Sequence, residues 1–278
     1  MKVLVTGAKG QLGTDVVKAL ALRGIAHVGV DRDDFDITNS EAVFSIVRSH
    51  NPDVVIHCAA YTAVDKAEDE PELCRQVNED GTLYIAQACK EIDAKMLYVS
   101  TDYVFPGHGE HFYLPTDSTG PVSVYGKTKL SGEKAVQGVL EKYFIVRISW
   151  VFGQHGGNFV KTMLRLSKER DSLNIVSDQV GSPTYTVDLA PLLCEIITTE
   201  KYGVYHATNE GVCTWAEFAC EIFRQAGLSV TVNSILTNEY PTKAVRPLNS
   251  RLDKDCLSEL GIVKLPHWKD ALARYLSV

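Results

Sequence analysis

Tyr125 and Lys129 are the first and last residues of Tyr125-Gly126-Lys127-Thr128-Lys129, the stretch of the sequence best suited to proton transfer. At this spacing the two side chains share one face of a helix. A phenol has an ordinary pKa of about 10, so it donates a proton to a developing alkoxide best when a nearby cation stabilises its phenolate. Lys129 could supply that cation. In a chain with 12 tyrosines such a pair also arises by chance, so its position matters.

A hydroxyl-bearing segment, Ser100-Thr101-Asp102, precedes this pair and follows an apolar run that we expect to form a strand at Lys95–Ser100. Ligands of open α/β sheets bind beyond the carboxyl ends of the strands. Thr101 could therefore hydrogen-bond a reacting oxygen while Tyr125 donates a proton. Lys129 would tune Tyr125 and hold a nicotinamide ribose. The alternative interpretation of Thr101 alone is a strand-end cap.

A glycine-rich loop, Gly7-Ala8-Lys9-Gly10-Gln11-Leu12-Gly13, lies between an expected strand at Lys2–Thr6 and an expected helix at Thr14–Ala21. Gly7, Gly10 and Gly13 would permit a tight turn, and free N–H groups of the helix N-terminus would point at phosphates. The alternative is a glycine-rich turn in another kind of α/β protein. The position at the first strand favours a dinucleotide site.

The choice of cofactor between NADPH and NADH rests on two adjacent residues. Asp31 ends the second expected strand, Ala26–Asp31, and its carboxylate favours the free 2′-hydroxyl of NADH. The guanidinium of Arg32 could instead pair with the 2′-phosphate of NADPH. Asp36 and Ile37 could contact adenine, although Asp36 could equally be a turn or cap residue.

The elements that must position these residues alternate over the first 150 residues. Two further strands are expected at Val54–His57 and Phe144–Ile148, and a helix at Ser40–His50 with the capping-box spacing Thr38-x-x-Glu41. This pattern predicts an α/β protein with a Rossmann-like, doubly wound parallel sheet. Residues 1–150 would be mainly the NAD(P)-binding domain, and residues 151–278 mainly a smaller C-terminal substrate-binding α/β part, with the chain free to cross back between them.

Composition excludes several classes of protein. The chain has 278 residues, 45% of them hydrophobic and 23% charged, which is typical of a globular protein. A net charge of −7 without a basic stripe argues against nucleic-acid partners, and no apolar run is long enough for a membrane span. The strand-like N-terminus does not resemble a signal peptide, so we expect a cytoplasmic location. Seven cysteines without Cys-x-x-Cys spacing and eight histidines without His-x-x-x-His spacing predict no metal site.

The glycine motif and the Tyr-x-x-x-Lys pair, in this order, resemble the extended short-chain dehydrogenase/reductase superfamily. Further stretches across most of the chain resemble one family within it, the dTDP-4-dehydrorhamnose reductases. These stretches are Cys58-Ala59-Ala60-Tyr61-Thr62-Ala63-Val64-Asp65-Lys66-Ala67-Glu68, Ser100-Thr101-Asp102-Tyr103-Val104-Phe105, Ser149-Trp150-Val151-Phe152, Asn158-Phe159-Val160-Lys161-Thr162-Met163, Arg246-Pro247 and Asn249-Ser250-Arg251-Leu252.

The resemblance implies NAD(P)H-dependent reduction of the C4 keto group of dTDP-4-dehydro-β-L-rhamnose to dTDP-L-rhamnose, a precursor of cell-surface polysaccharides. It implies that Thr101, Tyr125 and Lys129 form the catalytic set. It also implies dinucleotide contacts from Gln11, Leu12, Asp31, Ala59, Ala60 and Tyr61, and contacts of Thr101, Asp102 and Trp150 with the dTDP-linked keto-sugar.

Three expectations stay open at this point. Arg246 and Arg251 are either solvated surface residues or diphosphate contacts, and the acidity of the protein favours the second, because an anionic ligand then needs local cations. Some members of the family use Mg²⁺, with acidic side chains that link a homodimer. Only Asp15 lies nearby on the first expected helix, so the sequence does not support magnesium, and it leaves the homodimer open.

Two other functions compete with the reductase. An epimerase or 4,6-dehydratase of the same fold would oxidise and re-reduce its substrate, but dehydratase relatives carry an acidic pair after the threonine, and here Tyr103 follows Asp102. A non-catalytic protein is the other alternative, since the regulatory subunit of methionine adenosyltransferase is similar to these reductases. The intact set Thr101, Tyr125 and Lys129 favours an enzyme.

Overall fold

A six-stranded parallel sheet forms the centre of the computed structural model, which describes residues 1–278. Its strand order is β10-β5-β4-β3-β1-β2, and every neighbouring pair is parallel. The bounds are β1 (Lys2–Thr6), β2 (Ala26–Val30), β3 (Val54–His57), β4 (Lys95–Thr101), β5 (Tyr143–Ile148) and β10 (Gly203–His206). The chain moves outward from β1 in one direction to β2 and in the other through β3, so the predicted doubly wound sheet is confirmed.

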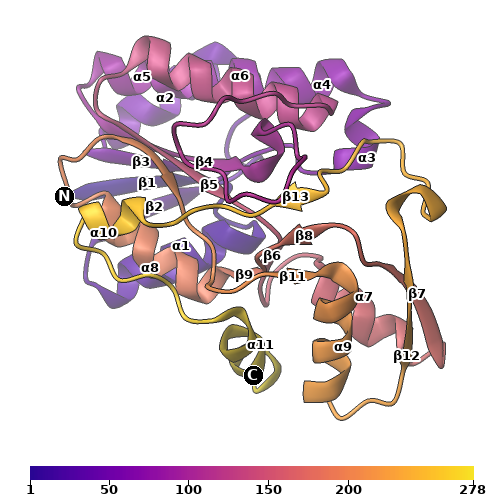
Figure 1. The fold of residues 1–278 in the computed structure, drawn as a ribbon. Coiled ribbons are helices and arrows are strands. Elements are labelled where there is room, and N and C mark those ends of the chain that lie inside the picture. The colour runs from indigo at the N-terminus through magenta and orange to yellow at the C-terminus, as the bar shows by residue number, and fades with distance from the viewer.

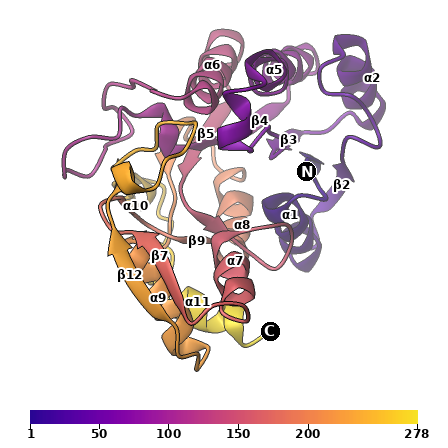
Figure 2. The ribbon, with the colours of Figure 1, turned by 90° about the vertical axis from the view of Figure 1, so that its right-hand side faces the viewer.

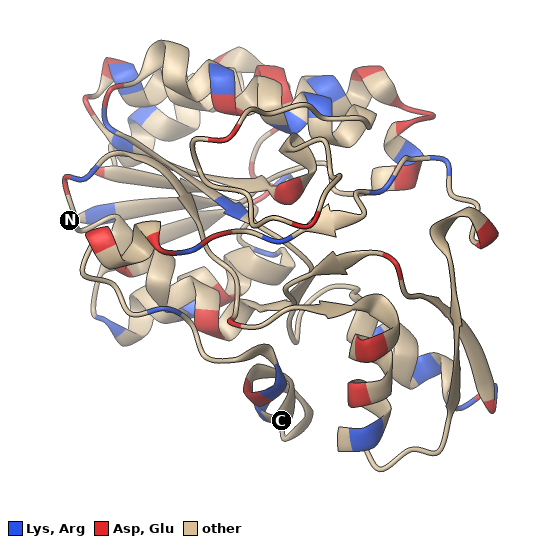
Figure 3. Cartoon of the chain, viewed as in Figure 1, with Lys and Arg blue, Asp and Glu red and all other residues tan.

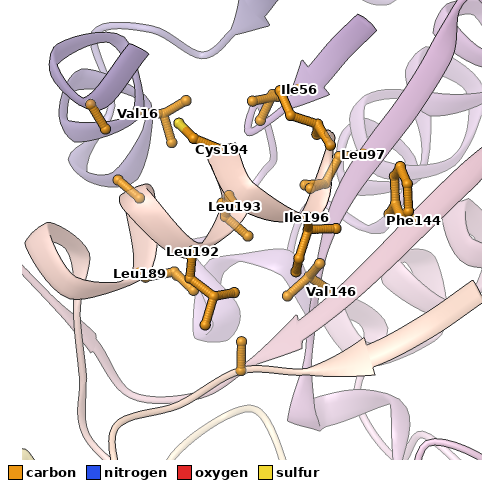
Figure 4. Packing of buried hydrophobic residues seen from close by; sticks show 14 of the residues in the cluster. Val16, Ile56, Leu97, Phe144, Val146, Leu189, Leu192, Leu193, Cys194 and Ile196 are labelled. Carbon is orange, nitrogen blue, oxygen red and sulfur yellow. The ribbon is translucent and has the colours of Figure 1, made fainter. Parts of the chain in front are cut away.

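Helices cover both faces of this sheet (Figure 1). One face carries α2 (Ser40–His50), α5 (Gly81–Glu91) and α6 (Val124–Val139), and the other carries α1 (Gln11–Leu22) and α8 (Thr186–Ile196). Between the sheet and the helices α1 and α8 lies a core that includes Leu97, Phe144 and Leu193 (Figure 4). This core fixes the strand ends that carry the site.

The chain crosses back between its two halves after residue 150. Both β10 and α8 come from the second half but belong to the large sheet and its cover. A separate lower part, visible in Figure 2, contains α7 (Phe159–Leu166), α9 (Trp215–Gln225), α11 (Trp268–Leu276) and the parallel pair β7 (Ser172–Val176) and β12 (Thr231–Ile235). Its own core is aromatic and includes Phe152, Phe218 and Trp268.

Short elements connect these two parts. The strand β13 (Asn249–Ser250) pairs with β8 (Val180–Gly181), which also pairs with β11 (Cys213–Thr214). Another short pair is β6 (Val151–Phe152) with β9 (Thr184–Tyr185). The remaining elements are α3 (Val64–Ala67), α4 (Pro71–Arg75), the π-helical turn η1 (Gln76–Asp80), the 3₁₀ turns η2 (Asp102–Val104) and η3 (Thr237–Glu239), and α10 (Cys256–Glu259).

The N-terminal caps of two helices can be compared with their capping-box sequences. The helix α2 has its predicted bounds, but its N-cap is Asn39, whose side chain accepts from the Ala42 N–H, so the predicted capping box at Thr38 is wrong. Thr38 instead donates to Asp36. The helix α9 does begin with a capping box, which Thr214 and Glu217 form.

The charged residues are mixed in sign over the surface, as the composition predicts. Figure 3 shows basic and acidic residues interspersed over the helices, without a stripe of one sign. None of the helices has both the length and the apolar character required to cross a membrane. All seven cysteines are free, and four of them are buried.

Candidate active site

The glycine loop closes tightly against neighbouring backbone. Gly7 has a φ of 66°, and a Cβ there would lie 2.7 Å from the Ala59 nitrogen. A Cβ on Gly13 would lie 2.0 Å from the Gly7 carbonyl oxygen. Gly10 is the N-cap of α1 and has no side-chain cap. The first N–H groups of α1 therefore face outward at the carboxyl end of β1, an arrangement that suits a pyrophosphate.

Gly13→Ala is expected to weaken NADPH binding by roughly 100-fold, because the loop must shift by about an ångström to admit the new methyl group. Titration of NADPH fluorescence would measure this loss. Gly138→Ala on α6 is the control, since its Cβ would meet nothing within 4 Å. The control should keep its affinity and gain about 0.5–1 kcal/mol in the free energy of unfolding. Equal affinities for the two variants would contradict the role of the loop.

The other glycine-loop residues have divided roles. Gln11 donates to the Val151 carbonyl at 3.3 Å and accepts from Asn158 at 2.9 Å, so it joins the loop to the second half of the chain. The Leu12 side chain lies in the core beneath the sheet. Leu12 can therefore contact a dinucleotide only through its backbone.

Asp31 and Arg32 follow the end of β2, beside the glycine loop. The Asp31 carboxylate accepts from the Lys9 N–H at 2.8 Å and from the Arg32 N–H at 2.9 Å, so it holds the loop against β2. Lys9 pairs with Asp33 at 2.8 Å. The exposed Arg32 guanidinium has no partner within the chain. A free cation at this place fits a 2′-phosphate better than a 2′-hydroxyl.

The residues predicted to contact the adenine and the rest of the dinucleotide follow β2 and β3. Asp36 accepts from both the backbone and the hydroxyl of Thr38, which is the turn geometry that the sequence left as an alternative. Ile37 packs toward α5, where a Cβ on Gly81 would lie 2.9 Å from it. Ala59 donates weakly to Thr6 at 3.4 Å. These side chains surround the carboxyl ends of β1, β2 and β3.

Asn78 fixes the segment from Ala59 to Tyr61, and the sequence analysis did not find it. Its side-chain oxygen accepts from the Tyr61 N–H at 2.8 Å, and its amide donates to the Tyr61 carbonyl at 3.1 Å. The same amide donates to Thr128 on α6 at 3.2 Å. Asn78 lies in η1, and π-helical turns are frequent at functional sites, so this irregular turn was the available signal.

Thr101 and Asp102 stand at the carboxyl end of β4. In the sheet register Thr101 is opposite Ile148 of β5, two residues before Trp150. The Thr101 hydroxyl donates to Asp102 at 3.0 Å, and Ser250 donates to the other carboxylate oxygen at 2.5 Å. Burial raises the pKa of Asp102 to about 6, although both hydrogen bonds oppose the shift. Ser250, which lies on β13, thus anchors the C-terminal segment beside Thr101.

Tyr125 lies in the first turn of α6, beside Thr101. Ser123 caps this helix by accepting from the Gly126 N–H, so the local sequence fixes where the turn begins. Enclosure of the phenol raises the pKa of Tyr125 above its ordinary value, and the nearby Thr101 hydroxyl only partly offsets this. The ring of Tyr103 packs edge-on against Tyr125, with 5.4 Å between centroids. At neutral pH Tyr125 is therefore a protonated phenol, the form that can donate.

The Lys129 ammonium makes its hydrogen bond to β4, and its tuning of Tyr125 stays a prediction. The ammonium donates to the Val99 carbonyl at 2.8 Å and lies 4.0 Å from the centre of the Tyr98 ring. The side chain is 2% exposed. Burial lowers the pKa of Lys129 to about 7, because an interior ammonium loses its hydration. The strand β4 thus offers this ammonium an acceptor and a ring face inside the protein.

Trp150 follows the carboxyl end of β5, at the same edge of the sheet as Thr101. Its φ of 49° is rare for a residue with a side chain, and such strain often marks a functional position. The indole stacks on Trp215 of α9 with 3.6 Å between centroids. Trp215 therefore connects the lower part to the edge of the site.

The two arginines differ in their surroundings. Arg246 donates to Asp65 at 2.6 Å and to the Tyr103 hydroxyl at 3.3 Å, so it reaches the ring that packs on Tyr125. Arg251 donates to its neighbour Asn249 at 3.0 Å and is not brought into contact with the catalytic set. Arg246 is thus the better placed of the two to meet an anionic ligand near Tyr125.

The magnesium expected from some relatives does not fit the side chains present. No group of three His, Cys, Asp or Glu residues is arranged to hold a metal ion. Asp15 is 5% exposed and accepts from the Thr186 hydroxyl at 2.6 Å, so its carboxylate is engaged inside the protein.

The sheet order, the glycine loop on β1 and the Tyr125–Lys129 pair on α6 are those of a dinucleotide-binding reductase with a doubly wound α/β fold. A family model described as the RmlD substrate binding domain matches residues 1–278. The dTDP-4-dehydrorhamnose reductase of Aggregatibacter actinomycetemcomitans is 43% identical, over 98% of this chain and 97% of its own length. That of Escherichia coli K12 is 41% identical, over 100% and 97% of the two chains. The chain belongs to the dTDP-4-dehydrorhamnose reductase family.

A solved structure gives the same answer. The dTDP-4-dehydrorhamnose reductase of Bacillus anthracis, in complex with NADP, superimposes with a TM-score of 0.97 at 41% identity, and the match covers 99% of this chain and 98% of that one. A UDP-glucose 4-epimerase of Thermus thermophilus, at 20% identity and a TM-score of 0.85, shares the fold.

Proposed function

We propose that the chain reduces the C4 keto group of dTDP-4-dehydro-β-L-rhamnose to dTDP-L-rhamnose with NADPH. One observation carries this proposal: Thr101, Tyr125 and Lys129 gather at the carboxyl end of β4 in a chain that matches reductases of this name over its whole length. The glycine loop, the free N–H groups of α1 and the unpaired Arg32 fit the pyrophosphate and 2′-phosphate of the cofactor.

Bound NADPH would supply the hydride. The residues of the chain supply orientation and the proton. The Thr101 hydroxyl, which donates to Asp102 in the structure, turns to donate to the keto oxygen, and Tyr125, protonated at neutral pH, gives its proton to the alkoxide that forms. Lys129 places a cation one helical turn away, which favours negative charge on the phenolate left behind.

The substrate would lie between the two parts of the chain. Arg246 of the C-terminal segment reaches Tyr103, which packs on Tyr125, and Trp150 follows the carboxyl end of β5, the strand paired with β4. We propose that Trp150 and Arg246 bind the sugar and the diphosphate, with Asp102 and Arg251 near them. Anchoring the nucleotide far from C4 contributes to rate by positioning the keto group. Nucleotide-free keto-rhamnose should therefore react slowly.

The competing functions lack supporting geometry. In place of the second acid that a dehydratase requires, Tyr103 packs on Tyr125 and binds Arg246. A purely binding subunit would not need a buried lysine held beside the strand that carries Thr101.

The decisive experiment is stoichiometric. Purified protein with dTDP-4-dehydro-β-L-rhamnose should consume one NADPH per dTDP-L-rhamnose formed, with absorbance and NMR as the measurements. An isomeric product made without net cofactor oxidation would establish an epimerase. Tight dinucleotide binding without any reaction would favour the binding subunit.

Arg32→Ala is expected to weaken NADPH binding by about tenfold and to leave NADH binding unchanged, the scale of one exposed charge-assisted contact. Both cofactors should be accepted, because Asp31 remains available to a ribose hydroxyl. Arg48→Ala on α2 is the matched control, since Arg48 pairs with Glu91 instead. Equal losses for the two cofactors would place Arg32 outside the 2′-phosphate site.

We further propose a cytoplasmic location, where NADPH is present, and a homodimer as the assembly to test. Cell fractionation and light scattering of the purified protein are the respective measurements.

A further inference from the structure

A buried ion pair lies directly behind the catalytic set. Glu133 of α6 is 1% exposed and Arg147 of β5 is 4% exposed. The guanidinium donates to the two carboxylate oxygens through Nε at 2.9 Å and Nη2 at 2.7 Å. Charged side chains are rarely buried this completely unless they are paired, and this pair has the bidentate geometry that a carboxylate and an arginine favour.

The Glu133 carboxylate is hydrogen-bonded to a residue that adjoins the catalytic set. The Glu133 oxygen that accepts from Arg147 Nε also accepts from the Ser100 hydroxyl at 2.5 Å, and Ser100 is the residue before Thr101. Glu133 lies one helical turn after Lys129, on α6, the helix that also carries Tyr125. The Glu133 carboxylate also raises the pKa of Lys129 against the larger effect of burial. One carboxylate thus connects β4, β5 and α6.

Arg147 extends the same connection to the segment that follows Thr101. Its guanidinium lies 4.9 Å from the centre of the Phe105 ring and donates to the Pro115 carbonyl at 3.2 Å. Phe105 immediately follows η2, the turn that Thr101 caps. The orientation of Thr101 is therefore held on one side by Ser100 and on the other by Phe105.

We propose that Glu133 is a positioning residue, which through Ser100 and Arg147 sets the distance between Thr101 on β4 and Tyr125 and Lys129 on α6. This inference rests on the reductase function proposed above. A buried ion pair contributes little net stability compared with apolar residues of the same volume, whereas it does favour one geometry over others. In this protein the favoured geometry is that of the proton-donating trio.

Two variants test the proposal in the full-length protein with NADPH and dTDP-4-dehydro-β-L-rhamnose. Glu133→Gln should lower kcat by roughly 100-fold, the scale of an ångström-sized displacement of reacting groups. Ser100→Ala, which breaks one hydrogen bond and leaves the ion pair intact, should lower kcat by about tenfold. In both, the KM for the keto-sugar and the Kd for NADPH should change by less than about threefold, because the binding residues stay in place.

Glu221→Gln on α9 is the matched control. Glu221 is also buried and accepts from Arg224 through two nitrogens, at 2.9 and 2.6 Å, but it lies in the lower part of the molecule. It should leave kcat unchanged even where its melting temperature falls. A normal kcat in folded Ser100→Ala and Glu133→Gln would overturn the proposal, and should Glu133→Gln fail to fold, a normal kcat in Ser100→Ala alone would do so. Wild-type protein that does not reduce the keto-sugar would instead refute the proposed function.

Discussion

Tyr125→Phe is expected to lower kcat by roughly 10³-fold, the middle of the range for loss of a general acid. The structure places this phenol beside Thr101 at the end of β4, where the keto oxygen would lie. The phenylalanine ring keeps the packing against Tyr103, so only the proton is lost. The Kd for NADPH should therefore stay within a few-fold of the wild-type value.

Tyr205→Phe on β10 is the control for loss of a phenol hydroxyl. Tyr205 donates to the Lys201 carbonyl at 2.6 Å, away from the catalytic set. It should turn over normally. If Tyr125→Phe kept substantial turnover at neutral pH, Tyr125 would not be the proton donor.

The raised pKa of Tyr125 also predicts which group limits the enzyme at high pH. Because the pKa of this phenol lies above 10, it stays protonated up to that pH. Any loss of rate between pH 7 and 10 must come from another group. Lys129, with a pKa of about 7, is the group of the trio that changes charge in that range.

The inner strands β1, β3, β4 and β5 were predictable because each is a short, mostly buried apolar run. Val54–His57 is buried at every position, and such runs are typical of a parallel sheet covered on both faces. The edge strand β10 was not predicted. Gly203-Val204-Tyr205-His206 is short and starts with a glycine, and it becomes a strand because β5 offers it a parallel partner.

The gathering of Thr101 and Tyr125 followed from topology, since the carboxyl end of β4 and the start of α6 must meet at one edge. The direction of Lys129 did not follow, because its acceptor, Val99, and the Tyr98 ring depend on packing. Arg246 and Asp65 are far apart in the sequence, so only the folded chain shows their pairing. Glu133 follows Lys129 by four residues, but its contacts with Ser100 and Arg147 depend on packing and did not follow from that spacing.

Lys129→Met is expected to impair catalysis severely while making the protein more stable. The ammonium is needed to favour the phenolate and to bind the ribose, so kcat should fall by at least about 100-fold and NADPH should bind more weakly. The long apolar side chain of methionine fills the same buried space. It removes an interior charge whose hydration was lost on folding. Function and stability therefore oppose each other at this position.

The gain in stability should depend on pH with a defined sign. The folded pKa of Lys129 is about 7 and its ordinary value is 10.5. Between these values the unfolded chain holds the proton and the folded chain does not, so wild-type stability rises with pH in this window. Below pH 7 both states hold the proton, and the cost of the buried charge is constant and largest. The advantage of Lys129→Met should thus be greatest below pH 7 and shrink towards pH 10.5.

Melting temperatures of both proteins between pH 6 and 10 would measure this difference. Lys127→Met is the control, because Lys127 is exposed on the same helix and its loss removes no buried charge. Its melting temperature should follow that of the wild type at every pH. A lower melting temperature for Lys129→Met below pH 7 would show that the contacts of the ammonium with Val99 and Tyr98 outweigh its desolvation. In that case the lysine would stabilise the fold as well as the reaction.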